Sequence, residues 1–382
     1  GLFTYLCLFS IEIGLVVSML FAIIVMQKTP LTPFRQILLT LLLIKIIWEG
    51  VIHFSLGGGG FGSYITAMAM NSIILVMLCV KIDERFIKSF AHVAFVIFFL
   101  DLAFNISNIA TGVDLLGREG AQLRPDDVLA RLGGLANHPF QSVNISLIAL
   151  FAAIHLNNFK LASLAVVALA INGTLRAPLA VALVILLLIT ILFLKRVKWQ
   201  FSPLAILCVA FTFAALVFAV TVYSASMTDI VNGNVLRVFA WTNAIKNIAS
   251  EPLLGVHTFT GGQITVVNTD TILDHGIAES AILGHWLRFG FLSPLLGVFL
   301  MIAISLRTSR VYLNDPSIGT SISSAAMAAF VLSDAFFGSF YGSVIPMSAY
   351  CVFCLSALDQ RATYAQQLRG RPRQPLVDRQ TA

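Results

Sequence analysis

The sequence predicts an all-α protein that crosses a membrane many times. Only 11% of its 382 residues are charged, against roughly 25% in soluble domains, and 58% are hydrophobic. The mean hydropathy is +0.91. Apolar runs of about 20 residues, the length that crosses a bilayer as a helix, recur along the chain. These three observations favour a polytopic membrane protein over a soluble domain.

Eleven apolar runs predict transmembrane helices. They lie near 2–26, 34–55, 63–81, 87–110, 140–156, 159–173, 177–194, 203–223, 281–305, 320–337 and 342–358. A further helix before Gly1 would bring the number to twelve. We expect residues 1–358 to form a single transmembrane domain, followed by a basic tail over 359–382.

Loop charges predict the orientation of the chain. Sixteen of the 24 lysines and arginines lie in the tail or in loops on one side of the predicted spans. Positive charge collects on the cytoplasmic side of membrane proteins, so this side is expected to face the cytoplasm. The net charge of +6 then requires no nucleic acid as a partner. The tail is expected to lie against the anionic headgroups of membrane lipids.

Two long segments, near 111–139 and 224–280, lie on the opposite side. Loops of this length inside a compact protein are usually functional or disordered. They carry five basic residues against the positive-inside pattern, namely Arg118, Arg124, Arg131, Arg237 and Lys246. Positive charge kept there favours an anionic ligand, with scattered solvated charge as the alternative.

The stretch NVLRVFAWTNAIKNIASEPLLGVHTF predicts an amphipathic helix over 234–251, ended by Pro252. Arg237 and Trp241 are one turn apart on one face. The helix could pack on the membrane interface. Alternatively, Arg237 binds an anion while the indole of Trp241 stacks on a sugar ring.

Arg176, in NGTLRAP, begins a predicted span on the outer side. An arginine at this boundary could simply reach the lipid headgroups. It could also bind phosphate oxygens with two parallel hydrogen bonds, which lysine cannot do.

The stretch DHGIAESAILGHWLRFGF places acids where an apolar helix begins. Asp274 or Ser280 could cap this helix, and Glu279 is favoured near a helix N-terminus. Alternatively, Glu279 accepts a proton from a sugar hydroxyl, with His275 one turn before it and Ser280 as a substrate contact.

The stretch RLGGLANHPFQSVN contributes two further candidate substrate-binding residues, Arg131 and His138. His138 precedes Pro139, whose fixed φ suits a helix start. A histidine in this place is either a feature of helix entry or a substrate contact.

Ionisable residues also occur inside predicted spans. Lys45 and Glu49 are one turn apart, which predicts that they pair. Asp101 and Asp334 lie in or near spans and could mark an ion path, so transport is an alternative function. No spacing of histidines, cysteines and carboxylates predicts a metal site, and no cofactor is expected.

Taken together, these stretches resemble the O-antigen polymerase and ligase superfamily, with its Wzy-type polymerases and WaaL-type ligases. The order matches over residues 130–305. It comprises HPF at 138–140, LR at 175–176, the series Arg237, Trp241, Ala244, Pro252 and Gly255, and ESAILGHWLRFG with Leu283 and Gly290 in register. Ligases carry a histidine where this chain has Glu279.

The resemblance implies a membrane glycosyltransferase of the GT-C class. Such enzymes transfer a glycan from undecaprenyl diphosphate to a sugar hydroxyl, with inversion and without a metal, on the periplasmic face of the bacterial inner membrane. Arg176 and Arg237 would bind the diphosphate, and Glu279 or His275 would act as base. Glu279 in place of histidine favours a polymerase over a ligase. A lipid-linked oligosaccharide flippase is the alternative of a different class, and a chain-length-regulating membrane protein is an expected partner.

Overall fold

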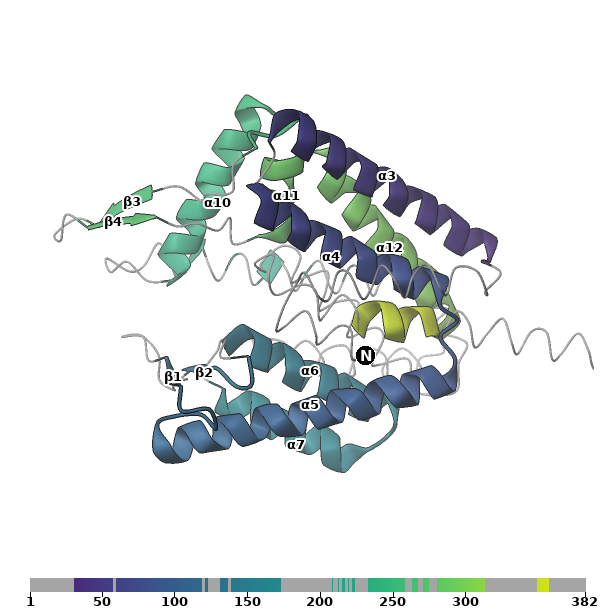
Figure 1. Cartoon of the computed structure of the whole chain (residues 1–382), viewed down its shortest axis with the longest axis vertical. Coiled ribbons are helices and arrows are strands. Elements are labelled where there is room, and N and C mark those ends of the chain that lie inside the picture. Colours follow the sequence, from purple (N-terminus) through teal and green to yellow (C-terminus); the bar gives the residue numbers. More distant parts are fainter. Residues whose placement is uncertain are drawn as a thin grey trace, which may run out of the picture.

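The computed structural model describes residues 31–57, 60–118, 121–122, 131–136, 139–172, 233–257, 263–266, 271–274, 280–312 and 349–356, with a few single positions between 208 and 223. Within these residues the chain is mostly helical and has two short β-hairpins (Figure 1). The predicted spans at 2–26, 177–194 and 320–337 lie outside the described residues.

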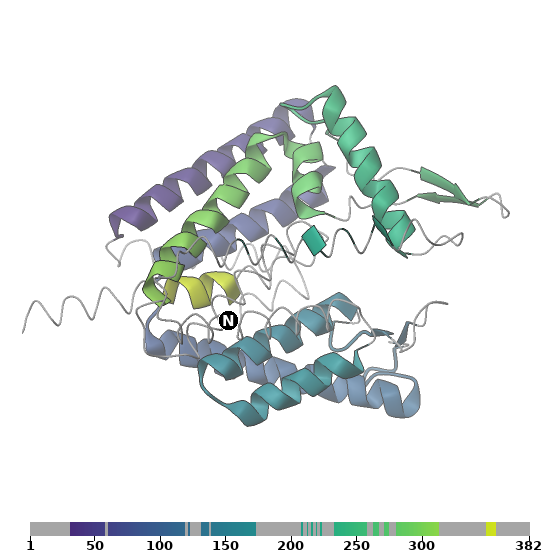
Figure 2. The same ribbon diagram turned by 180° about the vertical axis from the view of Figure 1, so that it is seen from behind.

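One group of helices contains α3 (Pro33–Leu56), α4 (Gly60–Cys79), α10 (Gly233–Ser250), α11 (Ala281–Phe289) and α12 (Leu292–Tyr312). Helix α3 packs against α4, α11 and α12, and α10 packs against α11. This group forms the upper half of the molecule in Figure 1, and the view from behind in Figure 2 shows the same arrangement. The position of α10 agrees with the helix that the sequence predicts over 234–251.

The second group contains α5 (Glu84–Thr111), α6 (Pro139–His155) and α7 (Phe159–Ile171), with α6 in contact with both neighbours. A short helix over 349–356 lies between the two groups (Figures 1 and 2). Its Tyr350 hydroxyl donates to the carbonyl oxygen of Met301 in α12, at 2.6 Å. The ring of Phe353 packs edge-on against Phe90 of α5, with centroids 6.0 Å apart. This segment therefore joins the two groups through one shared core.

The long helices begin and end at residues suited to these positions. Thr32 and Asp83 accept hydrogen bonds from the first turns of α3 and α5. Gly57 and Gly112 end the same helices in the left-handed conformation, which glycine adopts without strain. The apolar runs that predict helices near 34–55 and 87–110 end close to these caps.

The hairpins lie in the segments predicted as outer loops. Strand β1 (Ala121–Gln122) pairs antiparallel with β2 (Arg131–Leu132), and β3 (Gln263–Val266) pairs antiparallel with β4 (Thr271–Asp274). Both hairpins lie at the same end of the molecule (Figure 1). The all-α prediction did not include them, because pairing between short loop strands leaves no helical periodicity in the sequence.

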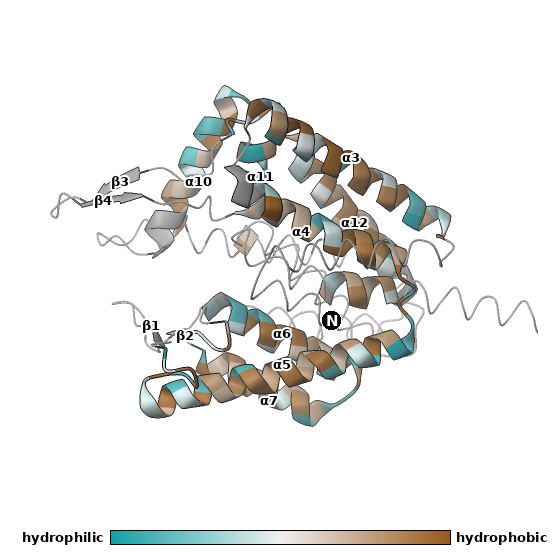
Figure 3. Cartoon of the chain, in the orientation of Figure 1, coloured by the Kyte–Doolittle hydropathy of each residue, from teal (hydrophilic) through white to brown (hydrophobic). Residues whose placement is uncertain are grey.

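Two described helices, α3 and α5, are long and apolar enough to cross a membrane. The distribution of apolar and charged side chains on these helices is the reverse of that on a helix of a soluble protein. Most outward side chains of α3 are apolar, including Ile47 and Phe54, which are 64% and 77% exposed, whereas Lys45 and Glu49 are buried. Helix α5 likewise exposes apolar side chains and buries Asp101. Figure 3 shows the apolar residues along both helices.

The single helix predicted over 281–305 is in fact two helices, α11 and α12, so that prediction is wrong in this respect. The break occurs at Gly290, whose φ of 72° and ψ of 179° do not continue a helix. A local signal for the break is Pro294, which has no N–H to donate to the Gly290 carbonyl and therefore cannot continue a helix through this point. The backbone of Leu253, in the turn that follows α10, also packs against Gly290.

Candidate functional site

Helices α10 and α11 bring together two motifs that lie far apart in the sequence. Ala244 and Ile248 of α10 form a buried apolar cluster with Leu287 of α11, and Leu283 packs against it. Trp241, nearly one turn before Ala244, is also buried. The face of α10 that carries Trp241 is therefore the face that packs against α11.

The turn that follows α10 ties the ends of the two helices together. The indole N–H of Trp286 donates to the carbonyl oxygen of Pro252, at 2.6 Å, and the N–H of Phe291 donates to that of Leu253, at 3.1 Å. Because the end of α10 is held at the end of α11, the turn that carries Arg237 points toward the side on which α11 begins.

Two glycines of the sequence motifs make this contact possible. Gly255 and Gly290 both have positive φ and face each other's backbone. A Cβ atom on Gly255 would lie 2.5 Å from the carbonyl oxygen of Trp286, and one on Gly290 would lie 2.3 Å from that of Leu253. The spacing of these glycines in the motif therefore reflects close packing of two backbone segments.

We expect that Gly255→Ala and Gly290→Ala each lower the free energy of unfolding by about 3 kcal/mol or more, because a left-handed alanine costs roughly 1–2 kcal/mol before any clash. Gly112→Ala is the matched control, since Gly112 has a φ of +80° but a Cβ atom there would meet nothing within 4 Å. Equilibrium unfolding in detergent micelles measures the difference. Equal losses in all three variants would contradict the close contact.

The structure describes some of the site residues that the sequence predicts, whereas others lie outside the described residues. Ser280 and Trp241 are described and buried, and the Ser280 hydroxyl accepts a hydrogen bond from the N–H of Leu283 at 3.4 Å. Ser280 therefore caps α11, whereas Asp274 lies in β4. Arg131 and Arg237 are placed by their backbones in β2 and α10. The remaining residues, Arg176, His138, His275 and Glu279, lie outside the described residues.

A buried carboxylate fixes the turn between Arg131 and His138. The N–H of Leu135 donates to Asp101 Oδ1 at 2.8 Å, and the Ser142 hydroxyl donates to Asp101 Oδ2 at 2.7 Å. Gly134 packs so closely on this carboxylate that a Cβ atom would lie 2.0 Å from Oδ1. Asp101 therefore connects α5 and α6 to a segment that carries predicted substrate contacts.

An outer ion pair supports the same turn. Arg118 Nε lies 2.6 Å from Asp114 Oδ2, and Arg118 Nη2 donates to the carbonyl oxygen of Leu135 at 3.2 Å. Burial alone would raise the pKa of Asp114, but hydrogen bonds from the backbone N–H groups of Arg118 and Leu116 and the adjacent guanidinium lower it overall. Arg118 is therefore engaged by protein groups and is a weaker candidate for an anion ligand than the sequence indicated.

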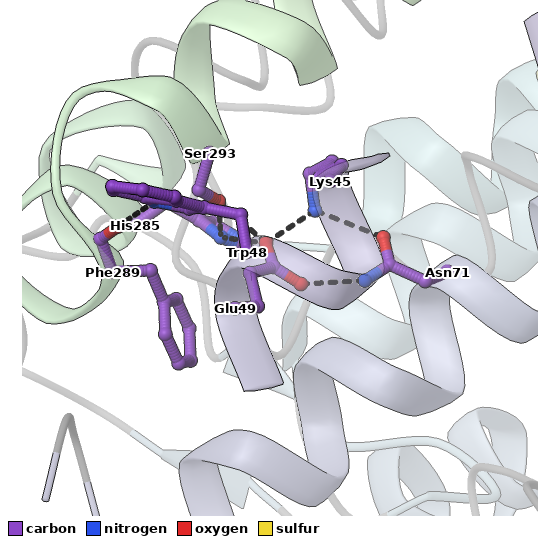
Figure 4. Close-up of polar contacts among 7 residues, drawn as sticks. All are labelled: Lys45, Trp48, Glu49, Asn71, His285, Phe289 and Ser293. Carbon is purple, nitrogen blue, oxygen red and sulfur yellow. Dashed lines mark hydrogen bonds and ion pairs between the residues drawn. The ribbon is translucent and has the colours of Figure 1, made fainter. Parts of the chain in front are cut away.

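A second buried polar network connects four helices (Figure 4). Lys45 Nζ lies 2.5 Å from Glu49 Oε1, which confirms the predicted pair. Asn71 of α4 bridges the two, because its Oδ1 accepts from Lys45 at 2.9 Å and its Nδ2 donates to Glu49 Oε2 at 2.6 Å. Ser293 of α12 donates to Glu49 Oε1 at 2.5 Å. His285 Nδ1 of α11 lies 3.2 Å from Ser293 Oγ and 3.5 Å from Glu49 Oε1.

The direction of these hydrogen bonds determines the state of one imidazole nitrogen. The Ser293 hydroxyl has a single proton, which it donates to Glu49. Its oxygen must therefore accept from His285 Nδ1, which carries a hydrogen. The chain of donors runs from His285 through Ser293 to Glu49, and all three residues are at most 5% exposed.

Asn71, Ser293 and His285 are the members of this network that the sequence did not single out. They are neutral or weakly basic residues within apolar runs, where a structural role is the usual interpretation. The only signal was their polarity inside predicted spans. Within the part of the chain that the structure describes, no group of three His, Cys, Asp or Glu side chains could hold a metal ion.

No protein-family model matches this chain, and no characterised protein matches it significantly.

Proposed function

We propose that the chain is a polysaccharide polymerase of the bacterial inner membrane. It transfers an undecaprenyl-diphosphate-linked glycan to a sugar hydroxyl of a second lipid-linked repeat unit on the periplasmic face. The observation that carries this proposal is the packing of α10 against α11. This contact joins the helix that carries Arg237 and Trp241 to the helix of the motif ESAILGHWLRFG. The resemblance to O-antigen polymerases requires these two motifs to act together.

The membrane location is supported by the inverted faces of α3 and α5. Water disfavours an apolar outward face with charged residues inside, whereas lipid favours it, because charged groups in a bilayer face the protein interior and pair there. The sequence has eleven apolar runs, and we propose that each of them contributes one membrane span, which in the run 281–305 is α12. The basic loops would then face the cytoplasm, and both hairpins would lie on the periplasmic side.

The proposed chemistry needs positive charge at the leaving group and a base at the acceptor. The departing lipid diphosphate carries at least two negative charges, so Arg176 and Arg237 stabilise it electrostatically. The acceptor hydroxyl loses its proton to Glu279 or His275. Trp241 and Ser280 lie close to this reaction centre, and Arg131 and His138 bind substrate from the other outer segment. No metal or other cofactor takes part in this scheme.

Two other functions are alternatives to the polymerase. A ligase would use the same donor and would transfer the glycan to a lipid core. A flippase is of a different class, and the buried network of Lys45, Glu49 and His285 favours it, since charged groups inside a membrane often mark ion paths. The other candidate residues fall in, or at the ends of, segments that the sequence predicts to face the periplasm, which favours transfer.

Deletion of the gene distinguishes the three functions. Loss of a polymerase is expected to leave single repeat units on the cell surface. Loss of a ligase would instead leave polymer on the lipid carrier, and loss of a flippase would leave repeat units on the cytoplasmic side. Complementation with Glu279→Gln and with His275→Ala identifies the base, because only the variant that lacks the base loses polymer. Polymer of normal length in the deletion strain would overturn the proposal.

A further inference from the structure

We propose that His285 is a positioning residue for the transfer reaction. Through Ser293 and Glu49 it fixes the rotation of α11, and thereby the placement of Ser280 at the start of that helix, which Glu279 directly precedes in the sequence. This inference rests on the proposed function, since it assigns a role within the same reaction centre.

Helix α11 is short enough for its orientation to be set by a few contacts. It has nine residues, which corresponds to a length of about 13 Å. Leu283 and Leu287 face α10, whereas His285 and Phe289 contact α3 and α12. The helix is therefore held at two places. Hydrogen bonds from the turn after α10 hold its last turn, and His285 ties its middle to Ser293 and Glu49.

The hydrogen-bonded surface is rigid because its carboxylate is fixed independently of α11. Lys45 and Asn71 hold both oxygens of Glu49 from α3 and α4. The Trp48 indole, on the neighbouring residue, donates to the carbonyl oxygen of Phe289 at 2.6 Å, which satisfies one of the last carbonyls of α11. Glu49 and Trp48 thus define where α11 must lie.

A displacement of α11 from this position would also displace groups of the proposed reaction centre. The start of α11 carries the capping Ser280, directly after Glu279, and lies about 7 Å along the axis from His285. A shift of about 1 Å in reacting groups can lower a rate by roughly 100-fold. A histidine that touches no substrate can therefore control turnover.

The test uses the full-length chain in lipid nanodiscs with lipid-linked single repeat units extracted from the deletion strain. We expect His285→Leu and Ser293→Ala to lower kcat by roughly 10- to 100-fold while KM changes little, since substrate binding groups remain. His285→Asn should recover most of the turnover, because its amide N–H replaces the Nδ1 donor toward Ser293. Thermal unfolding of each variant shows what fraction is folded at the assay temperature.

Thr308→Val is the matched control, because it removes a buried hydrogen bond to the carbonyl oxygen of Cys354 at the other end of α12. It should turn over at the wild-type rate. Wild-type kcat in folded His285→Leu would overturn the positioning role, as would His285→Asn no better than His285→Leu. Failure of the wild-type chain itself to elongate the repeat units would instead overturn the proposed function.

Discussion

Replacement of Glu49 by leucine is expected to lower the free energy of unfolding by about 3–5 kcal/mol, the cost of breaking a buried ion pair from one side. Lys45 would remain 3% exposed without a counter-charge, and Asn71 and Ser293 would lose their acceptor. Equilibrium unfolding in detergent micelles measures this loss.

The double variant Lys45→Met, Glu49→Leu distinguishes the contribution of the ion pair to stability from that of the hydrogen bonds around it. Replacing both members of a buried pair by apolar side chains is often neutral, so most of the stability should return. A double variant no more stable than Glu49→Leu would contradict the ion-pair explanation. It would indicate that the lost stability comes from the hydrogen bonds of Asn71 and Ser293. Because the double variant still lacks the acceptor for Ser293, it should fold yet turn over slowly, as the positioning role requires.

Arg237→Lys should lower turnover by roughly 100- to 1,000-fold while the protein remains folded, the effect of losing one preorganised donor to developing charge. Lysine keeps the charge but lacks the planar fork that binds two phosphate oxygens at once. The measurement is the initial rate of repeat-unit elongation in nanodiscs, together with thermal unfolding.

Lys246→Gln is the control for this substitution, because Lys246 is an exposed basic residue on the same helix, α10. It should elongate at the wild-type rate. Near-normal polymer from Arg237→Lys would remove Arg237 from the reaction centre. Equal losses in both variants would indicate a general effect of charge on the outer face.

Much of the helical framework could be predicted, since its signals are local. Helices α3 and α5 begin after Thr32 and Asp83 and end before Gly57 and Gly112, close to the predicted boundaries. The pairing of Lys45 with Glu49 also follows from helical spacing. The break at Gly290 has a local signal in Pro294, but the approach of the Leu253 backbone from the turn after another helix could not be predicted.

The candidate site was predicted less completely than the framework. The sequence indicated an association of the α10 and α11 motifs through a resemblance, and the structure places the two helices in contact. The sequence indicated neither the anchoring of the turn around Leu135 by Asp101 nor the contact between Glu49 and Ser293, which are 244 residues apart. Asp101 was interpreted as a candidate ion-path residue, and its three hydrogen-bond donors now give it a role in the fold.

The sequence by itself determined that the chain is helical and apolar and that it keeps a few ionisable groups inside its helices. These properties follow from composition, helical period and caps, which act over a few residues. The tertiary structure alone decided which of the polar groups meet, because a buried carboxylate must find donors wherever the packing of helices supplies them. In this protein Glu49 finds them on two other helices, α4 and α12. The Ser293 donor accepts in turn from His285 of α11, the helix that begins at the proposed reaction centre.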